Sequence, residues 1–251
     1  MRTVGVDLSA GDAKTWMATI DWADGAAVAT LERAVGDAAI VAAATRADKV
    51  GIDCPFGWPS EFVAFVQSHE ESNVDLQESP GETWRKRLAT RETDRWVHEK
   101  VGLTPLSVSA DLIGHVAFRC AHLLAMMKKA AIHVDRSGAT GTVVEVYPAA
   151  SLKRWALVHK GYKGRTGGHE LQAIAQQLLA DVPWLSVSDD DRQAITTNDD
   201  AFDALIAGCA ARAQALGLVE PLTNAQRHVG TVEGWIALPL ADSLPRLTLG
   251  G

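Results

Sequence analysis

The sequence has few cysteines and no residue spacing typical of a zinc site. Cys54, Cys120 and Cys209 lie far apart and form no Cys-x-x-Cys pair, so neither a disulfide framework nor a cysteine zinc site is expected. The eight histidines show no His-x-x-x-His or His-x-His spacing. A histidine zinc site is therefore not expected either.

Long apolar runs and an excess of positive charge are also missing. No run approaches the roughly 20 apolar residues that a membrane span requires, and the N-terminus starts without a charged-then-apolar signal, so a cytoplasmic location and no membrane partner are expected. The formal net charge of −7 gives no global attraction to nucleic acid. Any polyanionic ligand would need a local basic patch or a metal.

The 251 residues, of which 47% are hydrophobic, are enough to bury a large core in one domain, or in one domain with an insertion. Strands are expected at residues 2–8, 14–22, 27–33, 49–53 and 143–147. Helices are expected at residues 37–46, 60–69, 111–131, 148–159, 169–181, 190–194 and 199–216. The tail at residues 233–239 is expected to be extended.

Three of the short apolar runs carry an acid at or near their carboxyl end. These acids are Asp7, Asp53 and Glu145. A carboxylate at such a place is unfavourable in a buried strand unless it faces a cleft, a metal or a partner. One such acid is most often a turn former or a helix cap, but three together favour a functional site. Three roles remain open for Glu145: it could be a further metal ligand, a base that positions water, or simply the partner of an arginine.

A pair of acids opens the expected helix at residues 199–216. Asp200 and Asp203 are three residues apart, which places them on one helix face. Mg²⁺ and Mn²⁺ prefer oxygen ligands, and two-metal hydrolysis needs several carboxylates from different elements around ions about 4 Å apart. Without a cation, four clustered acids would repel one another and some would be protonated. The sequence therefore suggests a Mg²⁺ or Mn²⁺ site.

Two further features are candidates for substrate binding. Arg91, Asp94 and Arg95 could contact phosphate as a lid over the carboxylates, or could form structural ion pairs on a helix. Trp58 flanks a turn and could stack on a base. The glycine-rich basic segment at residues 161–168 lacks the fixed spacing of a P-loop, so a flexible surface loop is favoured over a nucleotide site.

Several segments together resemble a known family. They are GVDLS, GIDCPFGWP, TRETDRWV, VVEVYPAA, DDAFDALIAG and EGWIALP. Their pattern is similar to domain-of-unknown-function family 429 over nearly the whole chain, and the acids resemble the metal-binding set of Holliday-junction resolvases. The resemblance implies an α/β, ribonuclease H-like domain at residues 1–251, with a mixed five-stranded sheet flanked by helices and a helical insertion at about residues 55–140.

The activity that this resemblance implies is metal-dependent cleavage of phosphodiester bonds in DNA or RNA. Asp7, Asp53 and Asp203 would be the leading ligands, with Asp200 or Glu145 assisting. Two other classes remain open. The same core builds ATP-binding phosphotransferases of the sugar kinase and actin-like class, for which residues 9–14 would be the phosphate turn. A non-catalytic binding protein on this fold would also suit the acidic net charge.

Overall fold

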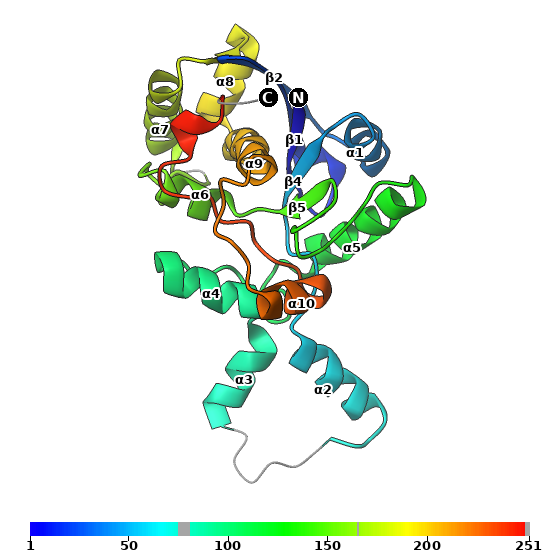
Figure 1. Ribbon diagram of the computed structural model, residues 1–251. Coiled ribbons are helices and arrows are strands. Elements are labelled where there is room, and N and C mark those ends of the chain that lie inside the picture. Colours follow the sequence, from blue (N-terminus) through cyan, green and yellow to red (C-terminus); the bar gives the residue numbers. More distant parts are fainter. Residues whose placement is uncertain (75–80, 165, 249–251) are drawn as a thin grey trace.

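The computed structural model describes residues 1–74, 81–164 and 166–248 and is built around one mixed sheet (Figure 1). Its six strands lie in the order β5-β4-β1-β2-β3-β6. They are β1 (Arg2–Asp7), β2 (Trp16–Ala23), β3 (Ala26–Arg33), β4 (Lys49–Asp53), β5 (Val143–Glu145) and β6 (Leu185–Val187). Strands β1, β2 and β3 are antiparallel neighbours, whereas β4 is parallel to β1, β5 to β4 and β6 to β3.

The expectation of five strands was wrong by one. The additional strand, β6, consists of three residues that pair in parallel with residues 27–29 of β3. It is too short to show an alternating pattern, and its strand conformation depends on the distant partner with which it pairs.

Ten α-helices surround this sheet in the described residues. They are α1 (Asp37–Ala44), α2 (Ser60–Glu70), α3 (Gly81–Ala89), α4 (Glu92–Val101), α5 (Gly114–Lys129), α6 (Pro148–Arg154), α7 (Gly168–Asp181), α8 (Asp189–Thr197), α9 (Asp199–Ala215) and α10 (Asn224–Glu233). The expected helices are present, although α6 ends five residues early. Helices α3, α4 and α10 are not among the expected ranges, although a helix was one of the two interpretations of Arg91, Asp94 and Arg95. The polar, acidic stretch at residues 70–82, for which the sequence pattern predicts an exposed loop, lies partly outside the described residues.

The two faces of the sheet are covered by different helices. Val4 and Val6 of β1 join the apolar cluster that includes residues of α1 and α5, whereas α9 belongs to a cluster with β2, β3 and α7. Because side chains alternate along a strand, Gly5 and Asp7 point to the face opposite Val4 and Val6. That face is the one against which α9 packs.

Glycines in β1 and β4 allow α9 to approach the sheet closely. A Cβ atom at Gly5 would collide with backbone atoms of Ala204 and Gly208, and one at Gly51 would collide with the carbonyl oxygen of Ala207. A larger residue at either strand position would push α9 away. The Gly-x-Asp spacing in both strands therefore places an acid next to the point of close contact.

Along the chain, helices α2 to α5 come between strands β4 and β5. Helices α2 and α3 extend away from the body as a protruding arm, whose described residues are 60–74 and 81–89 (Figure 1). The ring of Trp84 meets that of Phe65 edge-on at 5.5 Å, and Arg87 pairs with Glu61 at 3.0 Å. Among the described residues, no helix has both the length and the apolar character that crossing a membrane would require.

Candidate metal centre

Three carboxylates meet at the carboxyl ends of two central strands. Asp7 ends β1 and Asp53 ends β4, and the two are register partners in this parallel pair. Asp203 is almost fully buried on α9. One ligand oxygen from each of the three lies within 4.8 Å of the others. The structure therefore brings together the three residues that the sequence resemblance favoured as ligands.

Local sequence explains why Asp203 lies above the strand ends. Asn198 caps the N-terminus of α9, where its side chain accepts a hydrogen bond from the backbone N–H of Ala201. Asp203 is the fifth residue of α9, at the start of the second turn and just before the close contact of Ala204 and Gly208 with β1. The cap and the strand glycines together set the position of this carboxylate.

Two residues of the glycine-rich segment contact the centre. The hydroxyl of Tyr162 donates to Oδ1 of Asp203 at 2.8 Å, and Nζ of Lys163 lies 2.5 Å from Oδ2. The backbone N–H of Gly164 donates to Asp199 at 2.9 Å, which fastens the segment to the start of α9. Both residues were missed from the sequence, because a glycine-rich loop was expected at the surface. The only available signal was a Tyr-Lys pair inside that loop.

Burial makes three negative charges unfavourable here. It raises the pKa of Asp7, and the charges of Asp53, Asp203 and Asp200 raise it further. Burial also raises the pKa of Asp53 to about 7, despite the opposing effect of Lys163. For Asp203, burial outweighs the stabilising contacts with Lys163 and Tyr162, so its pKa is raised as well. A bound divalent cation would relieve this repulsion.

Lys163 is the cation that faces these acids in the structure. Its burial would lower its pKa, but the charges of Asp203 and Asp53 outweigh that effect and raise it. The ammonium group is therefore charged at neutral pH. It balances part of the negative charge of the three carboxylates.

Glu145 is not part of the three-carboxylate group. Both of its oxygens accept hydrogen bonds from the guanidinium of Arg91, at 2.7 and 2.9 Å, and one also accepts from the backbone N–H of Phe56. Burial raises the pKa of Glu145, whereas Arg91 opposes this change. Of the three readings of Glu145, this geometry matches the arginine partner and not the metal ligand or base.

Arg91 has no donor left for a phosphate. It is 1% exposed, and its five guanidinium N–H groups donate to Asp94, to Glu145 and to the carbonyl oxygen of Glu233. Asp94 is buried in the same ion pair, and it closes a capping box with Arg91 at the start of α4. For Arg91 and Asp94, the structure favours ion pairing over phosphate contact.

The remaining candidates lie around the centre. Arg95 pairs with Glu92 at 2.7 Å and is partly exposed. Asp200 is half-buried and outside the three-carboxylate group, although its charge acts on Asp7. The ring of Trp58 stacks on that of Phe118 at 5.8 Å. None of these three residues lines the cavity beside the carboxylates.

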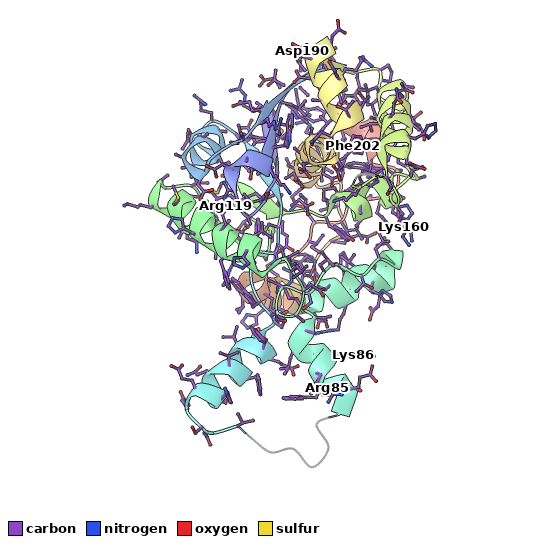
Figure 2. All side chains as sticks on the ribbon, turned by 180° about the vertical axis from the view of Figure 1, so that it is seen from behind. Arg85, Lys86, Arg119, Lys160, Asp190 and Phe202 are labelled. Carbon is purple, nitrogen blue, oxygen red and sulfur yellow. The ribbon has the colours of Figure 1, made fainter. Side chains whose placement is uncertain are left out.

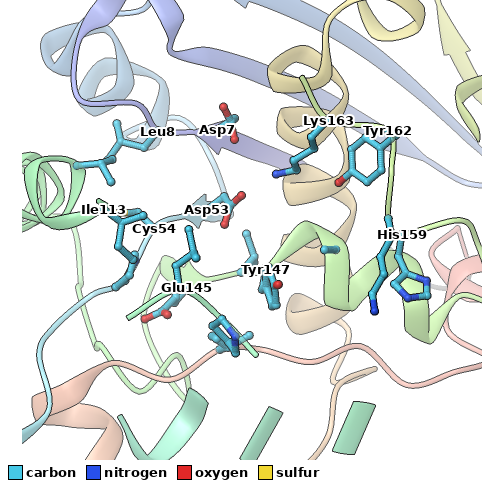
Figure 3. Close-up of a pocket in the computed structure, with 18 of the residues that line it drawn as sticks. Asp7, Leu8, Asp53, Cys54, Ile113, Glu145, Tyr147, His159, Tyr162 and Lys163 are labelled. Atoms are coloured by element: carbon cyan, nitrogen blue, oxygen red, sulfur yellow. The ribbon is translucent and has the colours of Figure 1, made fainter. Parts of the chain in front are cut away.

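That cavity has a volume of about 520 Å³. Asp7 and Asp53 line it together with Tyr162 and Lys163, and Figure 3 shows these side chains around a common space. Partly buried carboxylates that line an accessible cavity are typical of a ligand or metal site, because a charged ligand can reach them from solvent.

The fold and the site define an α/β protein with a candidate metal centre at the carboxyl ends of its central strands. The chain belongs to the family described as protein of unknown function DUF429, whose model matches residues 5–227. The resemblance to domain-of-unknown-function family 429 is confirmed. No curated protein and no solved structure matches the chain.

Proposed function

We propose that this protein is a divalent-metal-dependent nuclease of ribonuclease H-like fold. The observation that supports this most is the convergence of Asp7, Asp53 and Asp203, whose ligand oxygens lie within 4.8 Å of one another. The centre is also open to a cavity rather than sealed in the core. Carboxylates from two strands and one helix are the arrangement that phosphodiester hydrolysis with bound metal requires.

The topology is consistent with the ribonuclease H-like assignment. Three antiparallel strands are followed by helix α1 and by β4, which returns parallel to β1. The acids end β1 and β4, and the third lies on the helix that covers this face of the sheet. In this interpretation, β6 extends a five-stranded core at the edge formed by β3.

The donor set fits magnesium or manganese. All three groups are carboxylates, and hard cations of this kind prefer oxygen ligands. Asp7, Asp53 and Asp203 would hold one ion. Asp200, whose charge raises the pKa of Asp7, would assist at a second ion site. A bound cation would lower the pKa of a coordinated water and polarise a phosphate oxygen.

The residues around the centre would orient the substrate. Tyr162 holds Asp203 in a fixed orientation through its hydroxyl. Lys163, whose side chain is half exposed, can leave Asp203 for a phosphate oxygen once another cation neutralises the carboxylates. The apolar side of the cavity would limit the access of bulk water to the reacting phosphate.

A cleavage assay with matched variants tests this function. Wild-type protein should cut labelled DNA or RNA with Mg²⁺ or Mn²⁺ and leave ATP intact. Asp7→Asn and Asp203→Asn should each reduce cleavage by about 100-fold or more and weaken Mn²⁺ binding in calorimetry. Asp190→Asn, which changes an exposed acid on α8, is the control and should behave as wild type (Figure 2). Unchanged metal binding in the two site variants would contradict the proposal.

The phosphotransferase alternative has less support from the structure. Residues 9–14 do not present an open phosphate turn, because Arg119 pairs with Asp12 and donates to the carbonyl oxygen of Ser9. The hydroxyl of Ser9 donates to the carbonyl oxygen of Gly11. Hydrolysis or transfer of the γ-phosphate of ATP in the same assay would favour this alternative.

A further inference from the structure

The cavity beside the carboxylates has two chemically different walls. Lys163, with His159 and Lys160, forms a basic wall from the segment that follows α6. The other side is largely apolar and comes mainly from the segment before α5 and its first turn; it includes Leu8, Pro105, Leu106, Ile113 and Val116. A ligand that fills this space would carry an anionic group and an apolar or planar group side by side.

The size of the cavity limits what can enter. Its volume of about 520 Å³ lies within the range of about 300–1,000 Å³ that is typical of small-molecule sites. One nucleotide fits such a volume, whereas a double helix does not. Leu106 is 59% exposed although it lines this cavity, so its side chain is available to a ligand.

The position of the apolar wall next to the carboxylates discriminates between nucleic acid forms. In a duplex, each base faces the partner strand and turns away from its own phosphate backbone. A base can occupy an apolar pocket beside a protein-bound phosphate only when it is unpaired. The acidic chain also lacks the global positive charge that promotes duplex binding through phosphates alone.

We propose that the cavity holds one unpaired nucleotide, with its phosphate between the carboxylate centre and Lys163 and its base against Leu106 and Ile113. The preferred substrate is therefore single-stranded nucleic acid. This inference rests on the proposed nuclease function and specifies its substrate class. The basic wall of His159 and Lys160 would then contact the neighbouring phosphate of the strand.

A pair of adjacent substitutions tests the role of the apolar wall. Ile113→Trp fills part of the cavity, whereas Leu112→Trp adds the same ring to a fully exposed neighbour that does not line it. Ile113→Trp should reduce kcat/KM for a single-stranded oligonucleotide by about tenfold or more, the scale of one lost base contact. Mn²⁺ binding in calorimetry should stay unchanged in both variants, and Leu112→Trp should cleave as wild type.

Substrate comparisons with the wild-type protein keep the proposal testable if Ile113→Trp fails to fold. A single-stranded oligonucleotide should be cleaved about tenfold or more faster than a blunt duplex of the same sequence. An abasic nucleotide at the preferred cleavage position should remove most of this advantage.

The outcomes separate the inference from the proposed function. Equal or faster cleavage of the duplex, or full activity on the abasic strand, would overturn the single-strand assignment and leave the nuclease intact. Binding of a nucleoside monophosphate in calorimetry, without cleavage of any oligonucleotide, would overturn both and would indicate a small-molecule substrate. If no nucleic acid is cleaved in the presence of metal, the proposed function fails and the inference loses its basis.

Discussion

Lys163 balances part of the negative charge of the three clustered carboxylates in the absence of a metal. Its ammonium group contacts Asp203 directly, and its charge also acts on Asp53 and Asp7. One positive charge cannot balance three negative ones in a buried site, so some of the acids keep a proton near neutral pH. Metal binding is therefore expected to release protons and to compete with Lys163 for Asp203.

The raised pKa of Asp53 gives the metal-free protein a defined pH dependence. Its pKa is about 7 in the folded chain and near 4 when unfolded, so the folded state binds the proton more tightly. The contribution of this group to stability is therefore full below pH 4 and is lost as the pH rises through 7. The raised pKa values of Asp7 and Asp203 act in the same direction. Urea unfolding in a chelator should show lower stability at pH 8 than at pH 5.

The Asp53→Asn variant measures how much Asp53 contributes to this pH dependence of stability. The variant cannot ionise at that position, so its loss of stability between pH 5 and pH 8 should be smaller than that of wild type, by about 1 kcal/mol or more. Asp190→Asn, on the exposed surface of α8, should follow the wild-type curve. A wild-type protein that gains stability over this range would contradict the assigned shift.

At the scale of elements, buried ion pairs join the helices after β4 to the body. Arg91, at the N-terminus of α4, contacts Glu145 at the end of β5 and Asp94 in its own helix. The carboxylate of Glu233, at the end of α10, accepts from the backbone N–H groups of Ser60 and Glu92. A single carboxylate therefore holds the N-termini of α2 and α4 side by side.

Because Glu145 pairs with Arg91, its substitution should lower the stability of the protein without changing metal binding. Glu145→Gln leaves Arg91 buried with one carboxylate instead of two, which should destabilise the protein by about 3 kcal/mol. Mn²⁺ affinity should change little, because Glu145 is outside the three-carboxylate group. Thermal melts and calorimetry measure the two quantities. Glu92→Gln, in the exposed pair with Arg95, is the control and should cost under about 1 kcal/mol. Loss of metal binding in Glu145→Gln would restore this residue as a candidate ligand.

At the scale of the whole molecule, the parts that the sequence predicted are those with a local signal. Alternating apolar runs located five strands, and acids at two strand ends located Asp7 and Asp53. Features that depend on distant contacts were missed. Tyr162 reaches Asp203 across 41 residues, and β6 exists because β3 pairs with it. Helix α10 had a local signal, since Thr223 and Gln226 form a capping box, but its few buried residues give only a weak core pattern.

The architecture also predicts that the arm of residues 60–89 can be removed without loss of the metal centre. The backbone N–H groups of Ser60 and Glu92 bind the two oxygens of one carboxylate, at 2.8 Å each, so the chain enters and leaves the arm at neighbouring points. The arm has its own aromatic contact between Phe65 and Trp84, and none of its described residues lines the cavity beside the carboxylates. A short glycine-serine linker in place of residues 61–88 should span this distance.

The shortened protein should fold cooperatively and bind Mn²⁺ with an affinity within about threefold of wild type, because the ligands and the Arg91 ion pairs remain. Calorimetry and thermal melts provide the measurements, and a variant that also carries Asp203→Asn provides the metal-binding control. Loss of cleavage with intact Mn²⁺ binding would assign substrate contact to the arm. Loss of Mn²⁺ binding in a folded protein would instead show that the arm supports the carboxylate centre, contrary to the anchoring described for Glu233.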